Sequence, residues 1–172
     1  MHPPPALAVV GWSNSGKTTL LARLVPELRQ RGLRVGVVKH SSHPHPLHPE
    51  GTDTARYAET GAALVAFATP AGVQLSFPEP PEHVLSLLAR FADAVDLVLV
   101  EGWKHGPLPK LEVWREGLGP LLAASRPEVL AVVSESLLPE GPRRFSPDEV
   151  PGIAAFIQQC LRDGLLRAPE GP

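Results

Sequence analysis

The segment GWSNSGKT, from Gly11 to Thr18, matches the pattern G-x-x-x-x-G-K-[ST] at every specified position. The apolar run before it, residues 6–10, predicts a buried strand. Residues 17–31 follow with apolar side chains at helical spacing and stop at a glycine, which predicts an α-helix. A phosphate-binding loop has to lie between a strand and a helix, so both flanks support the motif. We therefore predict an α/β fold of the P-loop nucleotide-binding class.

Each residue type in this motif has a physical role in binding phosphate. The two glycines let the backbone turn tightly, so that successive N–H groups point at phosphate oxygens. The start of the following helix adds a positive dipole end at the same point. Lys17 can reach the β- and γ-phosphates, where it would also be catalytic, and the hydroxyl of Thr18 can ligate Mg²⁺. The predicted nucleotide-binding residues of this segment are Gly11, Trp12, Ser13, Asn14, Ser15, Gly16, Lys17, Thr18 and Thr19.

Strands alternate with helices along the rest of the chain. The expected strands are residues 34–39, 97–100, 111–114 and 129–133, and the expected helices are residues 52–60, 81–92 and 152–161. The segments 63–68 and 73–77 flank TPAG, a turn signal, and predict a β-hairpin. This order predicts a mostly parallel sheet flanked by helices, with the hairpin inserted at about residues 62–78. A chain of 172 residues is expected to form one nucleotide-binding domain, residues 1–172.

A magnesium site needs an acidic group beside the loop, and the segment DLVLVEG offers two. In parallel α/β sheets, ligands bind at the carboxyl ends of the strands. Glu101 lies at that end, so we predict that it ligates the metal together with Thr18 and that it is catalytic. The alternative is an ordinary strand-end acid that hydrogen-bonds to a loop. Asp96 lies at the other end and is expected to be a solvated residue at the start of the strand.

Two further positions flank the histidine-rich stretch that follows the second strand. Lys39 and His40 lie at the end of that strand and are predicted to bind the nucleotide. Asp53, beyond the stretch, could reach the metal or its waters, and we include it among the catalytic residues. The alternatives are surface charge for the first two and helix-terminal chemistry for Asp53.

The composition excludes several classes of function. A net charge of −2 argues against broad binding to nucleic acid, which requires a basic face. No apolar run approaches the roughly 20 residues of a membrane span, and the N-terminus lacks the basic region of a signal peptide. The lone Cys160 rules out an internal disulfide framework and is compatible with a reducing compartment. We expect a cytoplasmic protein that binds neither nucleic acid nor membrane.

Five segments in order resemble one family: GWSNSGKTTL, VVKHSSH, GTDTARYAETGA, LVLVEGWKHGPLPKLEV and FSPDEVPGIAAFI. Together they are similar to the molybdopterin-guanine dinucleotide biosynthesis protein B (MobB) family, over about residues 7–161. The resemblance implies a weakly hydrolysing GTP-binding protein, with GTP and Mg²⁺ as cofactors. It implies a homodimer and a partner, a MobA-type guanylyltransferase, that joins GMP to molybdopterin. The chain departs from the family in Trp103, where phenylalanine is common, and in SSHPHPLHP, where members often carry acidic residues.

The choice between GTP and ATP rests on that resemblance alone. Guanine-specific P-loop proteins often use Asn-Lys-x-Asp, and the only asparagine here is Asn14. DLVLVEG also resembles dethiobiotin synthetase, so an ATP-dependent enzyme of that type is one alternative. A metallochaperone GTPase is the other, because His40, His43, His45 and His48 stand close together in sequence. Prolines between these histidines restrict convergence of the rings, which favours a nucleotide-responsive loop.

A charged segment follows Glu101. Lys104 is predicted to bind the nucleotide, and with Lys110, Glu112 and Arg115 it could contact an anionic pterin phosphate or a partner protein. An ordinary solvated surface is an equal alternative. For Trp103, stacking on a planar ligand and half-burial are both open.

The predicted hairpin is apolar on both faces. Successive side chains of a strand point to opposite faces, and here hydrophobic residues occur on each of them. An insertion of this kind needs a covering surface, and a second copy of the chain is the simplest one.

Overall fold

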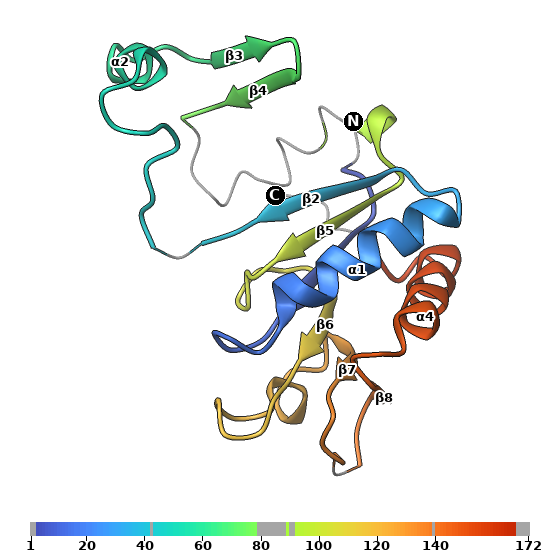
Figure 1. Ribbon diagram of the computed structural model, residues 1–172. Coiled ribbons are helices and arrows are strands. Elements are labelled where there is room, and N and C mark those ends of the chain that lie inside the picture. The colour runs from blue at the N-terminus through green and yellow to red at the C-terminus, as the bar shows by residue number, and fades with distance from the viewer. Residues whose placement is uncertain (1–2, 42, 79–88, 90–91, 139, 168–172) are drawn as a thin grey trace. The chain divides into compact units, whose positions relative to one another are not determined.

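The computed structural model describes residues 3–41, 43–78, 89, 92–138 and 140–167 (Figure 1). The chain divides into two compact units: residues 1–40 with 85–172, and residues 41–84. The helix expected at residues 81–92 falls almost wholly outside the described residues. The expectation of one domain over residues 1–172 stays a prediction.

The first unit is built on a six-stranded parallel sheet in the order β2-β5-β1-β6-β7-β8. Its strands are β1 (Ala6–Val10), β2 (Val35–Lys39), β5 (Leu97–Glu101), β6 (Lys110–Val113), β7 (Val129–Val133) and β8 (Arg143–Phe145). The predicted parallel sheet is therefore confirmed, and β8 is an addition that the apolar pattern did not indicate. Because all six strands are parallel, their carboxyl ends lie at one edge.

Two helices pack on one face of the sheet, α1 (Lys17–Gln30) and α4 (Val150–Arg162), as Figure 1 shows. Their leucines and isoleucines, at helical spacing, form one buried cluster with alternate residues of β1, β5 and β6. The other residues of β1 and β5 form a second cluster on the opposite face with Leu108. All five residues of β1 are buried, as expected for a central strand covered on both faces. Two short 3₁₀ turns, Ala92–Ala94 and Leu122–Ala124, also lie in the described part of this unit.

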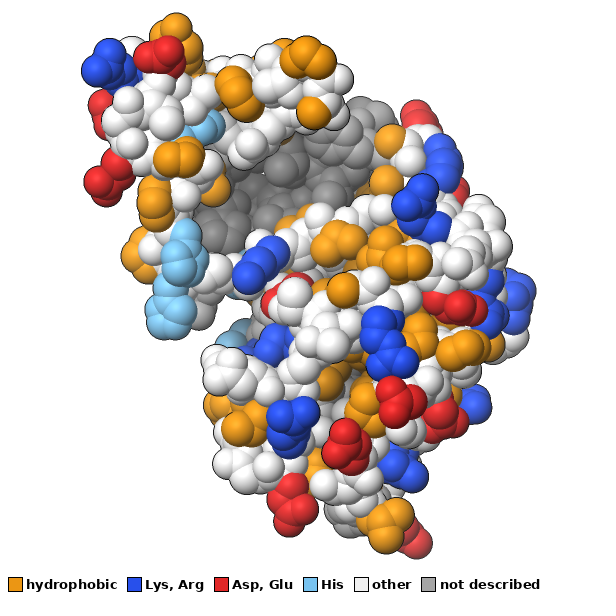
Figure 2. Space-filling view, viewed as in Figure 1, with side chains coloured by type: hydrophobic (Ala, Val, Ile, Leu, Met, Phe, Trp, Pro, Cys, Tyr) orange, Lys and Arg blue, Asp and Glu red, His pale blue; other side chains and the backbone are white. Residues whose placement is uncertain are grey.

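The second unit holds the predicted hairpin and a short helix. β3 (Val65–Thr69) pairs antiparallel with β4 (Gly72–Ser76), and α2 (Asp53–Glu59) begins after Thr52, whose hydroxyl accepts from the N–H of Ala55. Many apolar side chains here remain on the surface (Figure 2). Phe67 is 55% exposed and Val73 is 66% exposed.

Asp96 is not the simple solvated residue that we expected. Its carboxylate accepts from the Arg34 backbone N–H at 2.7 Å and from the guanidinium of Arg34 at 2.7 and 3.1 Å. The pair ties the amino ends of β2 and β5 together, and it holds the pKa of Asp96 below its usual range, chiefly through the side-chain hydrogen bonds. This use of Asp96 leaves Glu101 as the acid at the functional edge of β5.

Lys110 and Glu112 lie inside the protein, so neither sequence interpretation of the charged segment applies to them. The Lys110 ammonium donates to the carbonyls of Gly106 and Leu108 at 2.8 and 2.9 Å and pairs with Glu128 at 3.3 Å. The carboxylate of Glu112 accepts from two backbone N–H groups, those of residues 122 and 123, both at 2.8 Å. Both side chains have full partners and act as internal ties for the loops beside β6.

Among the described residues, no helix combines the length and the apolar character needed to cross a membrane.

The burial of Glu112 predicts a specific dependence of stability on pH. Burial raises the pKa of this carboxyl above the 4.5 usual for glutamate, against the opposing effect of its two N–H partners. A raised pKa in the folded state means that stability is lost as the pH rises through it. We therefore expect the free energy of unfolding of the unmodified protein to fall relative to Glu112→Gln as the pH is raised from 4.5. The slope should not exceed about 1.4 kcal/mol per pH unit.

Urea denaturation of both proteins at several pH values measures this difference. Glu140→Gln serves as the control for the substitution itself, because Glu140 is exposed. A stability of the unmodified protein that rises relative to Glu112→Gln would mean that the two hydrogen bonds outweigh burial.

Candidate functional site

The loop between β1 and α1 has a backbone that requires glycine. Gly11 has φ +148° and Gly16 has φ +101°, values that side chains rarely permit. A Cβ on Gly11 would collide with the carbonyl oxygen of Val113 and lie 2.7 Å from the Ser15 hydroxyl. The loop is therefore pressed against the end of β6. Asn14, at φ +63°, turns the chain a second time.

Lys17 lies across the mouth of this loop. Its ammonium donates to the carbonyl of Trp12 at 2.7 Å and to that of Gly11 at 3.2 Å. Partial burial lowers the pKa of Lys17, with a smaller contribution from the positive charges of Lys104 and Lys39, while Glu101 raises it. The three lysines and the one carboxylate thus share one electrostatic environment at the carboxyl edge of the sheet.

The two residues predicted to hold a metal are in contact. The hydroxyl of Thr18 donates to Oε1 of Glu101 at 3.0 Å. Glu101 is the last residue of β5, paired in register with Val9 of β1 and with Lys39 of β2. A hydroxyl and a carboxylate are the hard oxygen donors that Mg²⁺ prefers, so the chemistry of this pair fits that ion.

A buried hydroxyl also points to an oxyanion ligand. Ser15 is 5% exposed, and its Oγ has no hydrogen-bond partner among the described residues. Buried polar atoms are normally satisfied, and a lone donor inside a phosphate-type loop is suited to a ligand oxygen. The glycine backbone, Ser15 and Lys17 together fit a bound polyphosphate.

The remaining predicted residues of the first unit gather around the loop. Trp12 donates its indole N–H to the carbonyl of Pro120 at 2.8 Å, and the Lys104 ammonium lies 3.9 Å from the centroid of its ring. His40 stacks on Trp103 with ring centroids 5.3 Å apart and planes 15° apart. Trp103 is half-buried in this contact, and its positive φ of +61° places strained backbone two residues after Glu101.

Close packing also explains why glycine follows Glu101. Gly102 has φ +91°, and a Cβ there would lie 2.7 Å from the carbonyl oxygen of His40. The N–H of His40 donates to the Glu101 carbonyl at 2.9 Å. These contacts bring the ends of β2 and β5 together, so Lys39, His40 and Glu101 form one cluster. Ser13, Asn14 and Thr19 are exposed on the loop and the first turn of α1.

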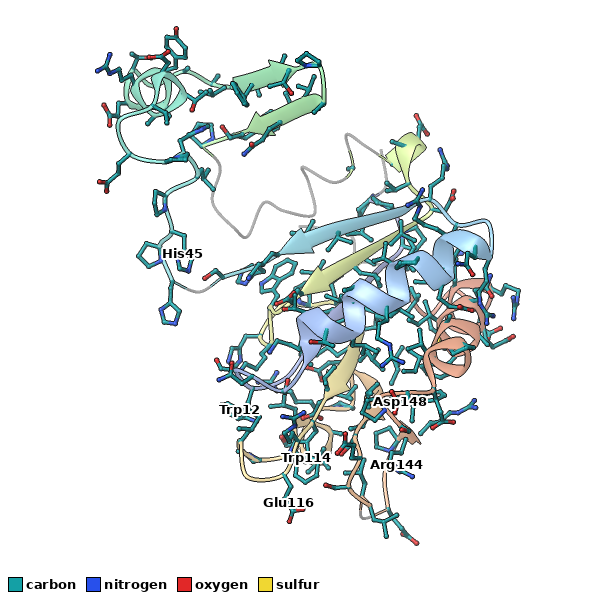
Figure 3. The ribbon with its side chains drawn as sticks, viewed as in Figure 1. Trp12, His45, Trp114, Glu116, Arg144 and Asp148 are labelled. Atoms are coloured by element: carbon teal, nitrogen blue, oxygen red, sulfur yellow. The ribbon has the colours of Figure 1, made fainter. Side chains whose placement is uncertain are left out.

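Asp53 belongs to the second unit, at the first turn of α2, and its catalytic role stays a prediction. His43 is exposed, and so is His45, which Figure 3 labels. Nε2 of His48 lies 2.8 Å from the hydroxyl of Ser76. Within the part of the chain that the structure describes, no three His, Cys, Asp or Glu side chains converge as a metal site would require.

A pocket beside the loop was missed in the sequence. It has a volume of about 200 Å³ and lies between the P-loop and the ends of β6 and β7. Its lining includes Trp114, Glu116, Glu135 and Ser136, which follow those two strands directly. Figure 3 shows Trp114 and Glu116 at this edge, near Trp12. The strand-end rule that selected Glu101 applies equally to these residues and could have found them.

Comparisons with known proteins agree with this arrangement. The family model described as molybdopterin guanine dinucleotide synthesis protein B matches residues 6–135. A molybdopterin-guanine dinucleotide biosynthesis adapter protein of Haemophilus influenzae is 38% identical over 159 residues, covering 91% of this chain and 89% of that protein. The adapter protein of Escherichia coli is 35% identical over 169 residues, covering 92% and 94%.

The fold has the same counterpart among solved structures. A crystal structure of molybdopterin-guanine biosynthesis protein B superposes with a TM-score of 0.70 at 31% identity, covering 91% of this chain and 99% of the other. The parallel sheet, the glycine-rich loop and the first helix are those of a P-loop NTPase. By sequence and by fold, this chain belongs to the MobB family.

Proposed function

We propose that this protein binds GTP with Mg²⁺, hydrolyses it slowly, and serves in the cytoplasm as an adapter for a MobA-type guanylyltransferase that joins GMP to molybdopterin. The observation that carries the proposal is the convergence of Lys17 with the Thr18–Glu101 contact at the end of β1. Phosphate-binding and metal-binding chemistry meet there on adjacent residues of one helix. The names of the H. influenzae and E. coli relatives support the adapter role.

Each residue of the site has a part in this proposal. The loop N–H groups, the Ser15 hydroxyl and the N-terminus of α1 bind phosphate oxygens. Lys17 exchanges its carbonyl partners for phosphate oxygens, and Thr18 and Glu101 hold the metal. Mg²⁺, when bound, neutralises negative charge on the phosphates.

The residues around the loop are proposed to assist in binding the nucleotide and the metal. Lys39 and Lys104 add positive charge, His40 keeps the end of β2 beside Glu101, and Asp53 is proposed to act on the metal's waters.

The expectation that hydrolysis is slow rests on the resemblance to the family. Guanylylation itself is assigned to the partner enzyme, for which this protein would supply or position the nucleotide. The choice of GTP over ATP rests on the family. A dethiobiotin-synthetase-like activity would instead appear as ADP production that depends on a diamine substrate.

Lys17→Ala tests the proposal directly. Among the described residues, the hydrogen bonds of the Lys17 ammonium go to loop carbonyls, so the fold should survive its removal. Affinity for GTP should fall by about 2 kcal/mol or more, the scale of a charged hydrogen bond to phosphate. Isothermal titration calorimetry measures the affinity, and thermal unfolding checks the fold. Unchanged GTP affinity in a folded Lys17→Ala protein would remove the central claim.

Glu101→Gln separates metal binding from phosphate binding. It keeps the shape and can still accept from Thr18, but it removes the charge that helps to hold Mg²⁺. Metal-dependent GTP hydrolysis should fall tenfold or more, on the order of 1.4 kcal/mol. GTP binding in EDTA should be unchanged, because the loop is untouched.

The double variant His43→Ser with His45→Ser is the matched control, since both histidines are exposed and should be neutral within about 0.5 kcal/mol. The reverse pattern would favour the metallochaperone class: normal hydrolysis in Glu101→Gln, together with tight Ni²⁺ or Zn²⁺ binding that the double variant loses.

We also propose that the protein is a homodimer that uses the hairpin. Phe67, Val73 and Leu75 are 55%, 66% and 44% exposed, and they lie on a two-stranded sheet that is too small to be stable alone. Analytical ultracentrifugation should give a dimer at roughly tens of micromolar, as for an interface of standard size. Phe67→Lys with Val73→Lys should shift the equilibrium to monomer, while Leu137→Lys, at an 88% exposed position of the first unit, should not. A monomer at that concentration would contradict the proposal.

A further inference from the structure

The pocket between the ends of β6 and β7 is continuous with the phosphate-binding loop. Ser15, Gly16 and Thr19 form its loop side, and the residues that follow the two strands form the opposite side. Its volume of about 200 Å³ is below the roughly 300–1,000 Å³ of sites that enclose a whole ligand. It is therefore suited to one planar group rather than to an entire nucleotide.

The topology of the sheet decides which end of a nucleotide would enter this pocket. β1 lies between β5 and β6, so the loop after β1 has β5 on one side and β6 with β7 on the other. Thr18 contacts Glu101 on the β5 side, whereas Thr19 lines the pocket. If the metal and the terminal phosphates lie toward β5, the nucleoside has to leave the loop toward β6 and β7.

The pocket combines apolar walls with a polar rim. Leu20, Val113 and Val133 contribute aliphatic surface, and Trp114 is held in place because its indole N–H donates to the carbonyl of Gly119 at 3.0 Å. Such a lining suits the faces of an aromatic base. Arg23, also in the lining, is already paired with Asp148 at 3.0 Å.

Glu116 is an exposed carboxylate on this rim that contacts a side chain of the facing loop. The hydroxyl of Ser136, which follows β7, donates to Oε2 of Glu116, which follows β6, at 3.5 Å. The N–H of Ser136 donates in turn to the Ser134 hydroxyl at 3.1 Å, and the side chain of Arg144 donates to the Ser134 carbonyl at 3.0 Å. The Ser136 contact places Glu116 beside the segment that follows β7. Figure 3 shows Glu116 on the loop that follows β6.

A carboxylate in this position distinguishes the two purines. Guanine presents two adjacent donors, N1–H and the 2-amino group. A carboxylate can accept a hydrogen bond from each of them at the same time. Adenine presents an N1 lone pair at the same place and would repel it. A carboxylate in this position therefore favours the base that supplies the donors over the base that presents a lone pair.

We infer that the pocket takes the guanine base and that Glu116 determines specificity for it, an inference that rests on the proposed binding of nucleotide at the loop. It supplies a guanine-reading residue that the sequence, without Asn-Lys-x-Asp, does not reveal.

The test compares GTP, ATP and xanthosine triphosphate by isothermal titration calorimetry with the full chain and Mg²⁺. The unmodified protein should prefer GTP to ATP at least tenfold. Glu116→Gln should lose at least tenfold in GTP affinity. It should also bind xanthosine triphosphate at least tenfold more tightly than the unmodified protein does, because a glutamine pairs an acceptor with N1–H and a donor with the 2-oxo group. That gain cannot come from a damaged fold.

Glu135→Gln is the matched control, since Glu135 lines the same pocket and lacks the contact with Ser136. It should keep the order of affinities of the unmodified protein. The inference is overturned if Glu116→Gln keeps its preference for GTP, or if the exchange toward xanthosine triphosphate occurs in Glu135→Gln instead.

Two results separate this inference from the proposal beneath it. If the unmodified protein binds GTP and ATP equally, and Lys17→Ala loses both, nucleotide binding stands and the role of Glu116 fails. If the unmodified protein binds none of the three nucleotides, the proposed function itself fails.

Discussion

The central strand β1 is the constraint on which the site depends. Its five residues are buried on both faces and pair in parallel with β5 on one side and β6 on the other. The chain that leaves β1 at Gly11 therefore emerges at the carboxyl edge, between the ends of two other strands. Gly11 has no room for a side chain because the β6 carbonyl of Val113 lies against it. The position of the loop thus follows from the packing of the sheet.

Ion pairs and buried charges in the first unit serve mainly to hold strand ends and loops. Arg34 and Asp96 join β2 to β5 at the amino edge. Lys110 donates hydrogen bonds to carbonyls that precede β6, and Glu112 accepts hydrogen bonds from N–H groups that follow it. A buried charge of this kind is costly to strip of its partners, so these side chains specify one loop arrangement more than they add net stability.

Sequence reasoning succeeded where a local rule applied. The loop could be found because its motif is contiguous. Glu101 could be singled out because parallel strands place their carboxyl ends together, and the structure places it in contact with Thr18, while metal binding by the two stays a prediction. β7 was predicted to the residue, since VLAVV is an uninterrupted apolar run. The match to the MobB family rested on the order of five segments and is confirmed.

The misses required contacts between distant segments. Lys110 and Glu112 looked like surface charges because their partners lie in loops whose course a linear pattern does not give. β8 reads Arg-Arg-Phe and carries no apolar run, so only its pairing with β7 makes it a strand. The strand-end rule points to the residues near Glu116, but the pocket is assembled from the loop, α1 and the ends of two strands, which only the fold brings together.

The segment from Trp114 to Leu122 is fixed at both ends. The backbone N–H of Trp114 donates to the carbonyl of Val133 at 3.0 Å, and the backbone N–H of Leu122 donates to the carboxylate of Glu112. A chain segment clamped in this way behaves as a closed loop, and the entropy of closure grows only slowly with length, by about 0.6 kcal/mol per doubling. Related proteins could therefore lengthen or shorten this segment at little thermodynamic cost while the sheet stays the same. Changes in the length of this segment would alter the surroundings of a bound ligand and leave the fold unchanged.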